Sequence, residues 1–368
     1  GELSLWAYQA IAHGADGIIF FRWRTARFGA EQYWHGILDH HGIPGRRYYE
    51  IRAMGEQMAR IGDQIEGATV KADVAMLLSY DARFAFQVQP NNPGFDYRQH
   101  FHDIYSALHQ RHVAVDIVSP DADLSAYKLL IVPALYVLDE DIGKAIAAYT
   151  KEGGTLEVTA RSGVKDGHNN VVGVKLPGML SKVCGVVVEE YDSLPPGVCQ
   201  PLTFTDVAGD LTGAPVARAW CDILQPTTAE VLATYSEDYY AGRAAVTLNR
   251  HGKGAACYVG TFGDAALYVS LAPMWLAVAG IETIAAAQEG IEICRRWQDG
   301  REIWFVLNHA AEAQQVPLPD GWVDLLDDES PVSDGLTMAP RAVRVLARDR
   351  QGVGMRHPDS SLDILEVR

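Results

Sequence analysis

The stretch GIIFFRWR at residues 17–24 decides how the chain begins to fold. Its apolar run at residues 18–21 is short and does not alternate, which predicts a buried strand covered on both faces, as in a parallel α/β sheet or barrel. Apolar residues at helical spacing predict a helix over residues 2–13 before it and another over 46–61 after it. One helix–strand–helix unit leaves the strand's edges unpaired, so we expect it to complete a larger structure.

From residue 72 onward, predicted strands and helices alternate. Apolar runs predict strands at residues 74–78, 113–118, 129–132 and 155–159. Helices are expected between them, at residues 97–110 and 139–151. This alternation with short turns predicts a doubly wound parallel sheet. Later strands are expected at residues 185–189, 230–235, 244–248 and 254–259, with a closing helix around Trp275.

The last part of the chain has an all-β pattern. Short, half-alternating runs predict strands at residues 291–297, 301–309, 314–317 and 342–347. The sequence Gln298-Asp299-Gly300-Arg301 predicts a tight hairpin between the first two. We therefore expect four parts, namely an opening segment over 1–65, a sheet domain over 70–284, a small antiparallel β domain over 288–350 and a tail over 351–368.

Composition limits the possible partners and compartment. The 368 residues carry 31 lysines and arginines against 47 aspartates and glutamates, a net charge of −16. This field repels nucleic acid and anionic lipid, and no apolar run approaches the ~20 residues that span a bilayer, so we expect neither nucleic acid nor a membrane as partner. Five scattered cysteines without a C-x-x-C pair favour reduced thiols in a cytoplasmic protein. Because the chain begins with Gly1, we expect its natural N-terminus upstream, and a signal peptide cannot be judged.

Functional side chains are densest between residues 20 and 41, directly after the predicted first strand. In a barrel, that position is the carboxyl-end mouth where active sites lie. Aromatic rings there could stack on sugars while carboxylate and imidazole groups bind hydroxyls, or the segment could be a solvated loop with an aromatic anchor. His35, His40 and His41 lack metal-ligand spacing, so we expect no metal site.

Three runs carry a family resemblance: GELSLWAYQAIAHGADG at residues 1–17, FFRWR at 20–24 and GAEQYWHG at 29–36. Together they resemble the beta-galactosidases of glycoside hydrolase family 42. The resemblance implies that residues 1–65 form the C-terminal end of a catalytic TIM (β/α)8 barrel. It also implies that residues 70–284 form a trimerisation domain similar to class I glutamine amidotransferases, where GGTL at 153–156 and RSGVKD at 161–166 are typical. Residues 288–350 would be the family's small C-terminal β domain.

The family hydrolyses terminal non-reducing beta-D-galactose residues with retention, which requires two carboxyl groups. The resemblance implies that both catalytic glutamates precede Gly1, so we expect no catalytic residue in this chain, no cofactor, and no activity of the chain alone. Phe21 would line the galactose pocket and Glu31 would accept hydrogen bonds from galactose hydroxyls. The family often has a histidine three residues after this glutamate. Here Trp34 holds that place and His35 follows, so both are candidates for the sugar contact, with His35 favoured.

Two other functions are considered beside an incomplete beta-galactosidase. One is a non-catalytic sugar-binding or assembly protein with an amidotransferase-like domain. The other is an active amidotransferase, but none of the five cysteines lies in the glycine-flanked strand-to-helix elbow that this chemistry requires. The middle domain is therefore expected to be a catalytically silent module that assembles a homotrimer. The aromatic loop at residues 84–97 could be an interface or a lid, or could fold back on its own domain.

Overall fold

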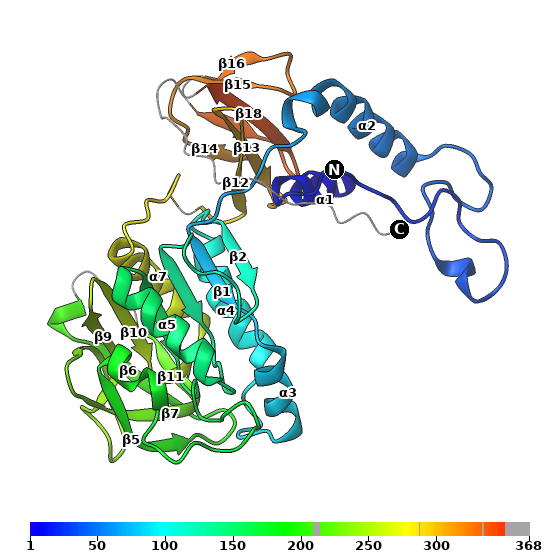
Figure 1. Ribbon diagram of the computed structural model, residues 1–368. Coiled ribbons are helices and arrows are strands. Elements are labelled where there is room, and N and C mark those ends of the chain that lie inside the picture. Colours follow the sequence, from blue (N-terminus) through cyan, green and yellow to red (C-terminus); the bar gives the residue numbers. More distant parts are fainter. Residues whose placement is uncertain (209–213, 287, 333–334, 350–368) are drawn as a thin grey trace, which may run out of the picture. The chain divides into compact units, whose positions relative to one another are not determined.

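The computed structural model describes residues 1–208, 214–286, 288–332 and 335–349, so the expected tail over 351–368 lies outside the described residues. The chain divides into two compact units (Figure 1). The first unit combines Gly1–Lys71 with Gln288–Arg368, and the second unit is Ala72–Ala287. The two ends of the sequence therefore fold together, with the second unit inserted between them.

The second unit is built on one mixed sheet whose parallel part has the strand order β2-β1-β3-β4-β10. This is the order of a doubly wound sheet of flavodoxin type. Its strands are β1 (Val74–Leu77), β2 (Val115–Val118), β3 (Leu129–Val132), β4 (Thr155–Thr159) and β10 (Gly254–Val259). The predicted parallel sheet is confirmed by the parallel pairing of these strands. Strands β1, β3, β4 and β10 are also buried along their whole length, as strands covered on both faces must be.

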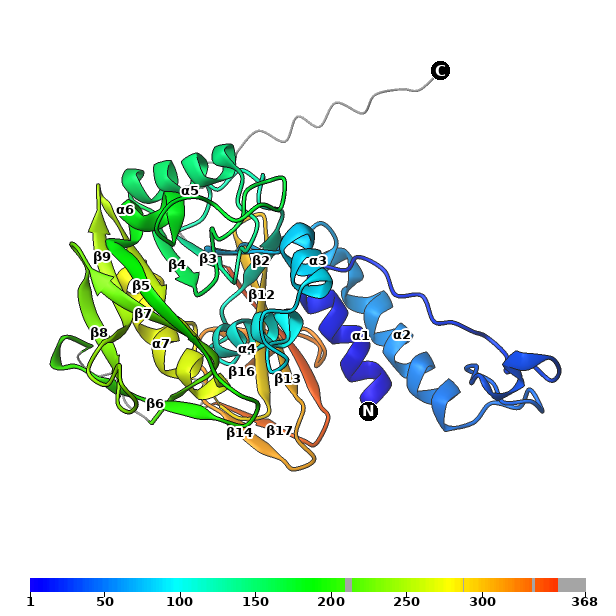
Figure 2. The ribbon, with the colours of Figure 1, turned by 90° about the horizontal axis from the view of Figure 1, so that it is seen from below.

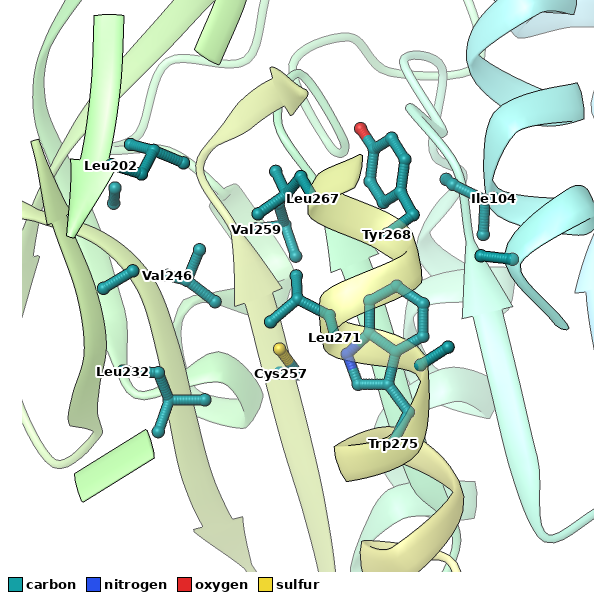
Figure 3. Close-up of a cluster of buried hydrophobic side chains, with 14 of the residues drawn as sticks. Ile104, Leu202, Leu232, Val246, Cys257, Val259, Leu267, Tyr268, Leu271 and Trp275 are labelled. Carbon is teal, nitrogen blue, oxygen red and sulfur yellow. The ribbon is translucent and has the colours of Figure 1, made fainter. Parts of the chain in front are cut away.

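Helices cover both faces of this sheet, as Figure 2 shows. One face packs against α4 (Tyr97–His109) and α7 (Ala265–Val278), and the other against α5 (Glu140–Glu152) and α6 (Ser181–Cys184). Leu267, Leu271 and Trp275 of α7 lie against Cys257 and Val259 of β10 (Figure 3). A helix with such a continuous apolar surface is stable only when it is buried.

An antiparallel extension widens the sheet. It contains β5 (Val186–Ser193), β6 (Cys199–Phe204), β7 (Val216–Pro226), β8 (Glu230–Tyr235), β9 (Ala244–His251) and β11 (Thr261–Gly263). Strands β6 and β7 have no counterpart among the sequence predictions. The sequence of β7, VARAWCDILQP, mixes apolar residues with Arg218 and Asp222 and contains no long apolar run. The strand pairs with β5, β6, β9 and β11, and this pairing buries it.

The aromatic loop expected at residues 84–97 is a helix followed by a turn that packs inward. Phe84 and Phe86 belong to α3 (Tyr80–Val88). The side chain of Ser79 caps the N-terminus of this helix by accepting a hydrogen bond from the amide of Ala82. The Phe86 ring stacks on Tyr136 at a centroid distance of 4.3 Å, and Phe95 stacks on Phe262 at 3.9 Å. The alternative in which the aromatics fold back on their own domain therefore holds for Phe86 and Phe95, whereas Phe84 is exposed.

The first unit packs two helices and a small β structure together. The helices are α1 (Glu2–Ala12) and α2 (Arg46–Ile65). A five-stranded sheet contains β12 (Ile291–Gln298), β13 (Arg301–Asn308), β18 (Val343–Asp349), β15 (Trp322–Asp324) and β16 (Ser330–Val332), and a separate pair contains β14 (Gln314–Val316) and β17 (Leu336–Met338). The predicted hairpin is confirmed, since Asp299 and Gly300 both have positive φ angles, of 45° and 83°, as a two-residue hairpin turn requires.

The predicted strand at residues 18–21 is wrong for this structure. These residues form no ladder, and Ile19 and Phe21 are 97% and 73% exposed, while Ile18 and Phe20 pack on the core that α1 shares with the sheet. The sequence pattern shows that the segment is apolar, but a strand also needs neighbouring strands, and the described residues provide none beside it. The exposed side of the segment is therefore apolar surface without a partner here.

A buried carboxyl group lies in the middle of the parallel sheet. Glu157 of β4 is fully buried opposite Cys257 of β10. Burial raises the pKa of Glu157 well above its ordinary value, and the backbone of Val132 offsets only part of this effect. The native state therefore holds the proton at pH values where the unfolded chain has lost it.

This burial makes the stability of the second unit depend on pH. A raised folded pKa means that stability falls as pH rises above the unfolded value of about 4.5, by up to about 1.4 kcal/mol per pH unit. Glu157→Gln should therefore gain stability relative to the wild type as pH goes from 5 to 8. Hydrogen exchange of β4 amides across a urea series measures this, with the exposed Glu152→Gln as control. Equal pH dependence in wild type and Glu157→Gln would contradict the argument.

Candidate active site

The loop that joins α1 to α2 carries all four side chains expected to contact a sugar, and it projects beyond the N-terminal end of α2 (Figures 1 and 2). Backbone hydrogen bonds hold together two stretches of this loop, residues 22–25 and 36–38, which we call its two arms. The amide of Ile37 donates to the carbonyl of Arg22 at 2.7 Å, that of Leu38 to Trp23 at 2.8 Å, and that of Thr25 to Leu38 at 2.9 Å. The loop therefore has a defined backbone although it contains little regular structure.

A threonine and a glycine close the crossing point of the two arms. The Thr25 side chain is buried, donates to the carbonyl of Leu38 at 3.0 Å and accepts from the amide of Gly36 at 2.9 Å. A Cβ at Gly36 would lie 2.5 Å from the backbone of Arg24, so no larger residue fits there without moving the opposite arm. This explains physically why glycine follows Trp34 and His35 in the loop.

The sugar-contact candidates lie on the surface of this braced loop. Phe21 and Trp34 are 73% and 62% exposed, and His35 is also exposed. Glu31 lies in the short helix η1 (Ala30–Tyr33) and forms an ion pair with Arg22. The structure thus brings Glu31 and Arg22 together, a pairing that the sequence analysis did not anticipate, and leaves all four candidate side chains accessible.

The other polar residues of the loop have structural partners. Asp39 forms an ion pair with Arg47, and its carbonyl accepts from the Gly42 amide at 2.9 Å. The His40 ring contacts the carbonyl of Gln32 at 2.9 Å, and His41 accepts from the amide of Ile43 at 3.1 Å. These contacts make Asp39 and the two histidines supports of the loop's turn.

In the second unit, the position after β4 has the backbone strain of a nucleophile elbow but not its chemistry. Arg161 there has a φ of 67°, a left-handed conformation that is rare for a residue with a side chain. Its guanidinium lies 4.1 Å from the Trp220 ring centroid and forms a hydrogen bond with Asn91. An arginine stacked inside the fold cannot attack a carbonyl. No local sequence pattern reveals this cluster, because its members lie far apart in the chain.

The three buried thiols and the buried histidine of this unit are also unsuited to catalysis. Burial raises the pKa of Cys221 to about 12 and that of Cys184 and Cys257 further, so these thiols stay protonated and are poor nucleophiles. Burial lowers the pKa of His100 to about 3, and its ring contacts the hydroxyl of Thr159 at 2.9 Å. His100 is therefore a neutral core residue.

A cavity of about 510 Å³ lies at the carboxyl ends of β1 and β2, the edge where doubly wound sheets bind ligands. Ser79, Ser119, Asp121 and Asp139 are among its lining residues. No cysteine or histidine lines it. The chemistry of an amidotransferase is therefore absent from this edge as the structure describes it.

The family models agree with the division of the chain. A model described as the beta-galactosidase trimerisation domain matches residues 72–282, one described as beta-galactosidase matches residues 1–61, and one described as the beta-galactosidase C-terminal domain matches residues 290–348. No helix in the described ranges is both long and apolar enough to cross a bilayer.

Individual relatives give the same picture. Beta-galactosidase BgaA of Clostridium cellulovorans is 35% identical over 312 residues, which cover 85% of this chain and 46% of the relative. Beta-galactosidase Bga of Halorubrum lacusprofundi is 33% identical over 369 residues, covering 95% and 52%. The crystal structure of beta-galactosidase from Bacillus circulans sp. alkalophilus superimposes with a TM-score of 0.90 at 31% identity, covering 94% of this chain and 51% of that one.

The chain spans about half the length of the curated relatives it matches. The three family models, each named for a beta-galactosidase, together match residues 1–61, 72–282 and 290–348. The chain therefore belongs to the beta-galactosidases of glycoside hydrolase family 42, and it corresponds to their C-terminal portion.

Proposed function

We propose that residues 1–65 complete the (β/α)8 barrel of a retaining beta-galactosidase and supply one wall of its galactose pocket. Phe21, Glu31, Trp34 and His35 form this wall. The supporting observation is the braced loop, which holds two aromatic faces, a carboxylate and an imidazole in solvent on a fixed backbone. Exposed rings beside hydrogen-bonding groups are what a sugar subsite needs, because rings cover C–H faces while polar groups bind hydroxyls.

The apolar segment before the loop supports the same proposal. Ile19 and Phe21 expose an apolar side that pairs with no strand in the described residues, although the Arg22 guanidinium lies 4.8 Å from the Phe21 ring centroid. Barrel strands on either side would cover it and turn Phe21 toward the barrel mouth. In this arrangement residues 18–21 are the strand that the sequence predicts.

The chain itself performs substrate binding in this proposal, and the bond cleavage belongs to residues outside it. Retention requires a nucleophile and an acid/base carboxyl group about 5 Å apart. We assign neither of these two catalytic roles to Glu31, because its carboxylate forms an ion pair with Arg22 at the surface. We assign the two catalytic glutamates to barrel strands outside residues 1–368, with no cofactor, and we assign Glu31 to the galactose hydroxyls.

The second unit is proposed as a catalytically silent, amidotransferase-like assembly module of a homotrimer. The name of the family model over residues 72–282 supports a trimer, and the buried Arg161 in the elbow position supports the silence. Tyr80 and Phe84 form an exposed aromatic pair on α3, with centroids 5.9 Å apart, and we propose that it contacts a second copy of the chain. Five free thiols are compatible with a cytoplasmic protein, the location we propose.

The 368-residue chain alone should not hydrolyse a chromogenic beta-galactoside. Without both carboxyl groups, neither protonation of the leaving group nor formation of the glycosyl intermediate can occur. The same assay on the chain extended by its own upstream coding sequence should show turnover. Turnover by the 368-residue chain above a buffer blank would refute our assignment of the catalytic glutamates.

In the extended enzyme, Glu31→Ala should lower kcat/KM through the loss of a charge-assisted hydrogen bond of about 1.5–3 kcal/mol, or roughly 10- to 100-fold. Glu56→Ala is a matched control, because Glu56 is equally exposed and also pairs with an arginine, Arg52, on the outer side of α2. Equal kinetics for the two variants would remove Glu31 from the pocket.

The purified chain should sediment as a trimer of 40.3 kDa protomers. Phe84→Asp should shift it toward the monomer, since a charge buried in an apolar interface costs several kcal/mol, whereas Tyr239→Asp, a similarly exposed aromatic on another loop, should leave the trimer intact. Analytical ultracentrifugation distinguishes these states. A wild-type chain that remains monomeric at micromolar concentration would count against the assembly role.

A further inference from the structure

A cluster of three different metal-binding side chains lies in the first unit, where α1 meets β12. The Nε2 of His13 lies 2.6 Å from Oε1 of Glu292 and 3.5 Å from the Sγ of Cys294, and that sulfur lies 3.2 Å from the same Oε1. Within the described residues, these are the histidine, cysteine and acidic side chains whose ligand atoms gather within 4.8 Å of one another. The sequence does not reveal the cluster, because 279 residues separate His13 from Glu292.

The surrounding fold fixes each of the three side chains. Glu292 and Cys294 are two residues apart on β12, so their side chains leave the strand on the same face. The second oxygen of Glu292 accepts from Gln9 at 2.8 Å and contacts the His309 ring at 2.7 Å. A carboxylate held in this way presents its first oxygen to His13 and Cys294 in one orientation.

The separations are those of a tetrahedral zinc site with small adjustments. Zinc–ligand bonds of about 2.0–2.3 Å place neighbouring donors roughly 3.3–3.5 Å apart. The distances from Cys294 to His13 and to Glu292 already fall near this range. Only the His13–Glu292 distance has to open, by roughly 0.7 Å, and the His13 side chain is 41% exposed and has room to move.

We propose that His13, Glu292 and Cys294 form a site for a divalent transition-metal ion, with zinc as the expected occupant. Nitrogen, carboxylate oxygen and thiolate sulfur are the donors that zinc takes in proteins. On binding, the proton that the Cys294 thiol carries passes to solvent, and the metal–sulfur bond forms in its place. The fourth position faces the exposed side of His13 and holds a water molecule.

The role of this site is structural and regulatory for the first unit. The metal would connect the residue that follows α1, His13, to β12. It would thus join two parts of the first unit that the whole second unit separates along the sequence. Since ligands that bind only the folded form stabilise it, metal supply would set the stability of the segment that carries the sugar-binding loop. The expectation of no metal rests on the spacing of His35, His40 and His41, whereas the proposed site uses other residues.

The test is Co²⁺ binding to the purified 368-residue chain, followed by absorption spectroscopy. A Cys294–cobalt bond gives a thiolate-to-metal charge-transfer band, which a site without sulfur lacks, and Zn²⁺ should abolish the band by competition. Cys294→Ser, which keeps a hydrogen-bonding group of similar size, should lose the band and weaken Co²⁺ binding by about 100-fold or more. His13→Gln should also weaken binding strongly.

Two control variants make the result specific. Cys199→Ser changes an exposed thiol in the second unit and should leave the band unchanged. His309→Gln changes the residue behind the other carboxylate oxygen and should keep the band, with binding weakened by roughly 10- to 100-fold. A wild-type chain without a charge-transfer band, or a band that survives Cys294→Ser or disappears in Cys199→Ser, would overturn the proposal. Circular dichroism of each variant confirms that it is folded.

Discussion

One buried arginine joins the beginning of the chain to its end. Arg296 of β12 is 2% exposed, and its guanidinium donates to the carbonyls of Ile11 at 3.0 Å, Ala15 at 3.2 Å and Ala68 at 3.0 Å. It also pairs with Asp16 at 2.8 Å. Among these acceptors, Ile11 belongs to the last turn of α1, and its carbonyl also accepts from the amide of Gly14 at 3.0 Å. A buried cation is tolerated only when such a set of acceptors surrounds it.

This anchor determines where the functional loop begins. Because Arg296 fixes the chain at Ala15 and Asp16, the apolar segment at residues 18–21 leaves the core in one direction, with Ile18 and Phe20 packed and the alternate residues exposed. The same face of β12 carries Glu292 and Cys294 beside His13. The loop between α1 and α2 and the inferred metal site therefore depend on one helix end and one strand face.

Several polar side chains of the second unit are buried or stacked inside the fold. Its parallel sheet has a strained residue after β4, but the residue is an arginine packed on Trp220. Burial raises the pKa of Glu157 and lowers that of His100, in both cases the direction that disfavours the charged form. Both side chains are part of the packed interior of the unit.

Sequence alone determined the strands of the parallel sheet, the hairpin and the family, and these rest on local information. Unalternating apolar runs located the parallel strands, Asp299-Gly300 located the hairpin, and the run at residues 1–36 located the resemblance. Tertiary structure decided what depends on distant neighbours. Residues 18–21 need flanking strands to become one, β7 is buried by its partners, and Arg296 and Glu292 meet α1 only after a whole unit has been inserted between them. Local pattern fixes which backbone conformation is favourable, whereas burial and pairing across hundreds of residues are properties of the packed chain.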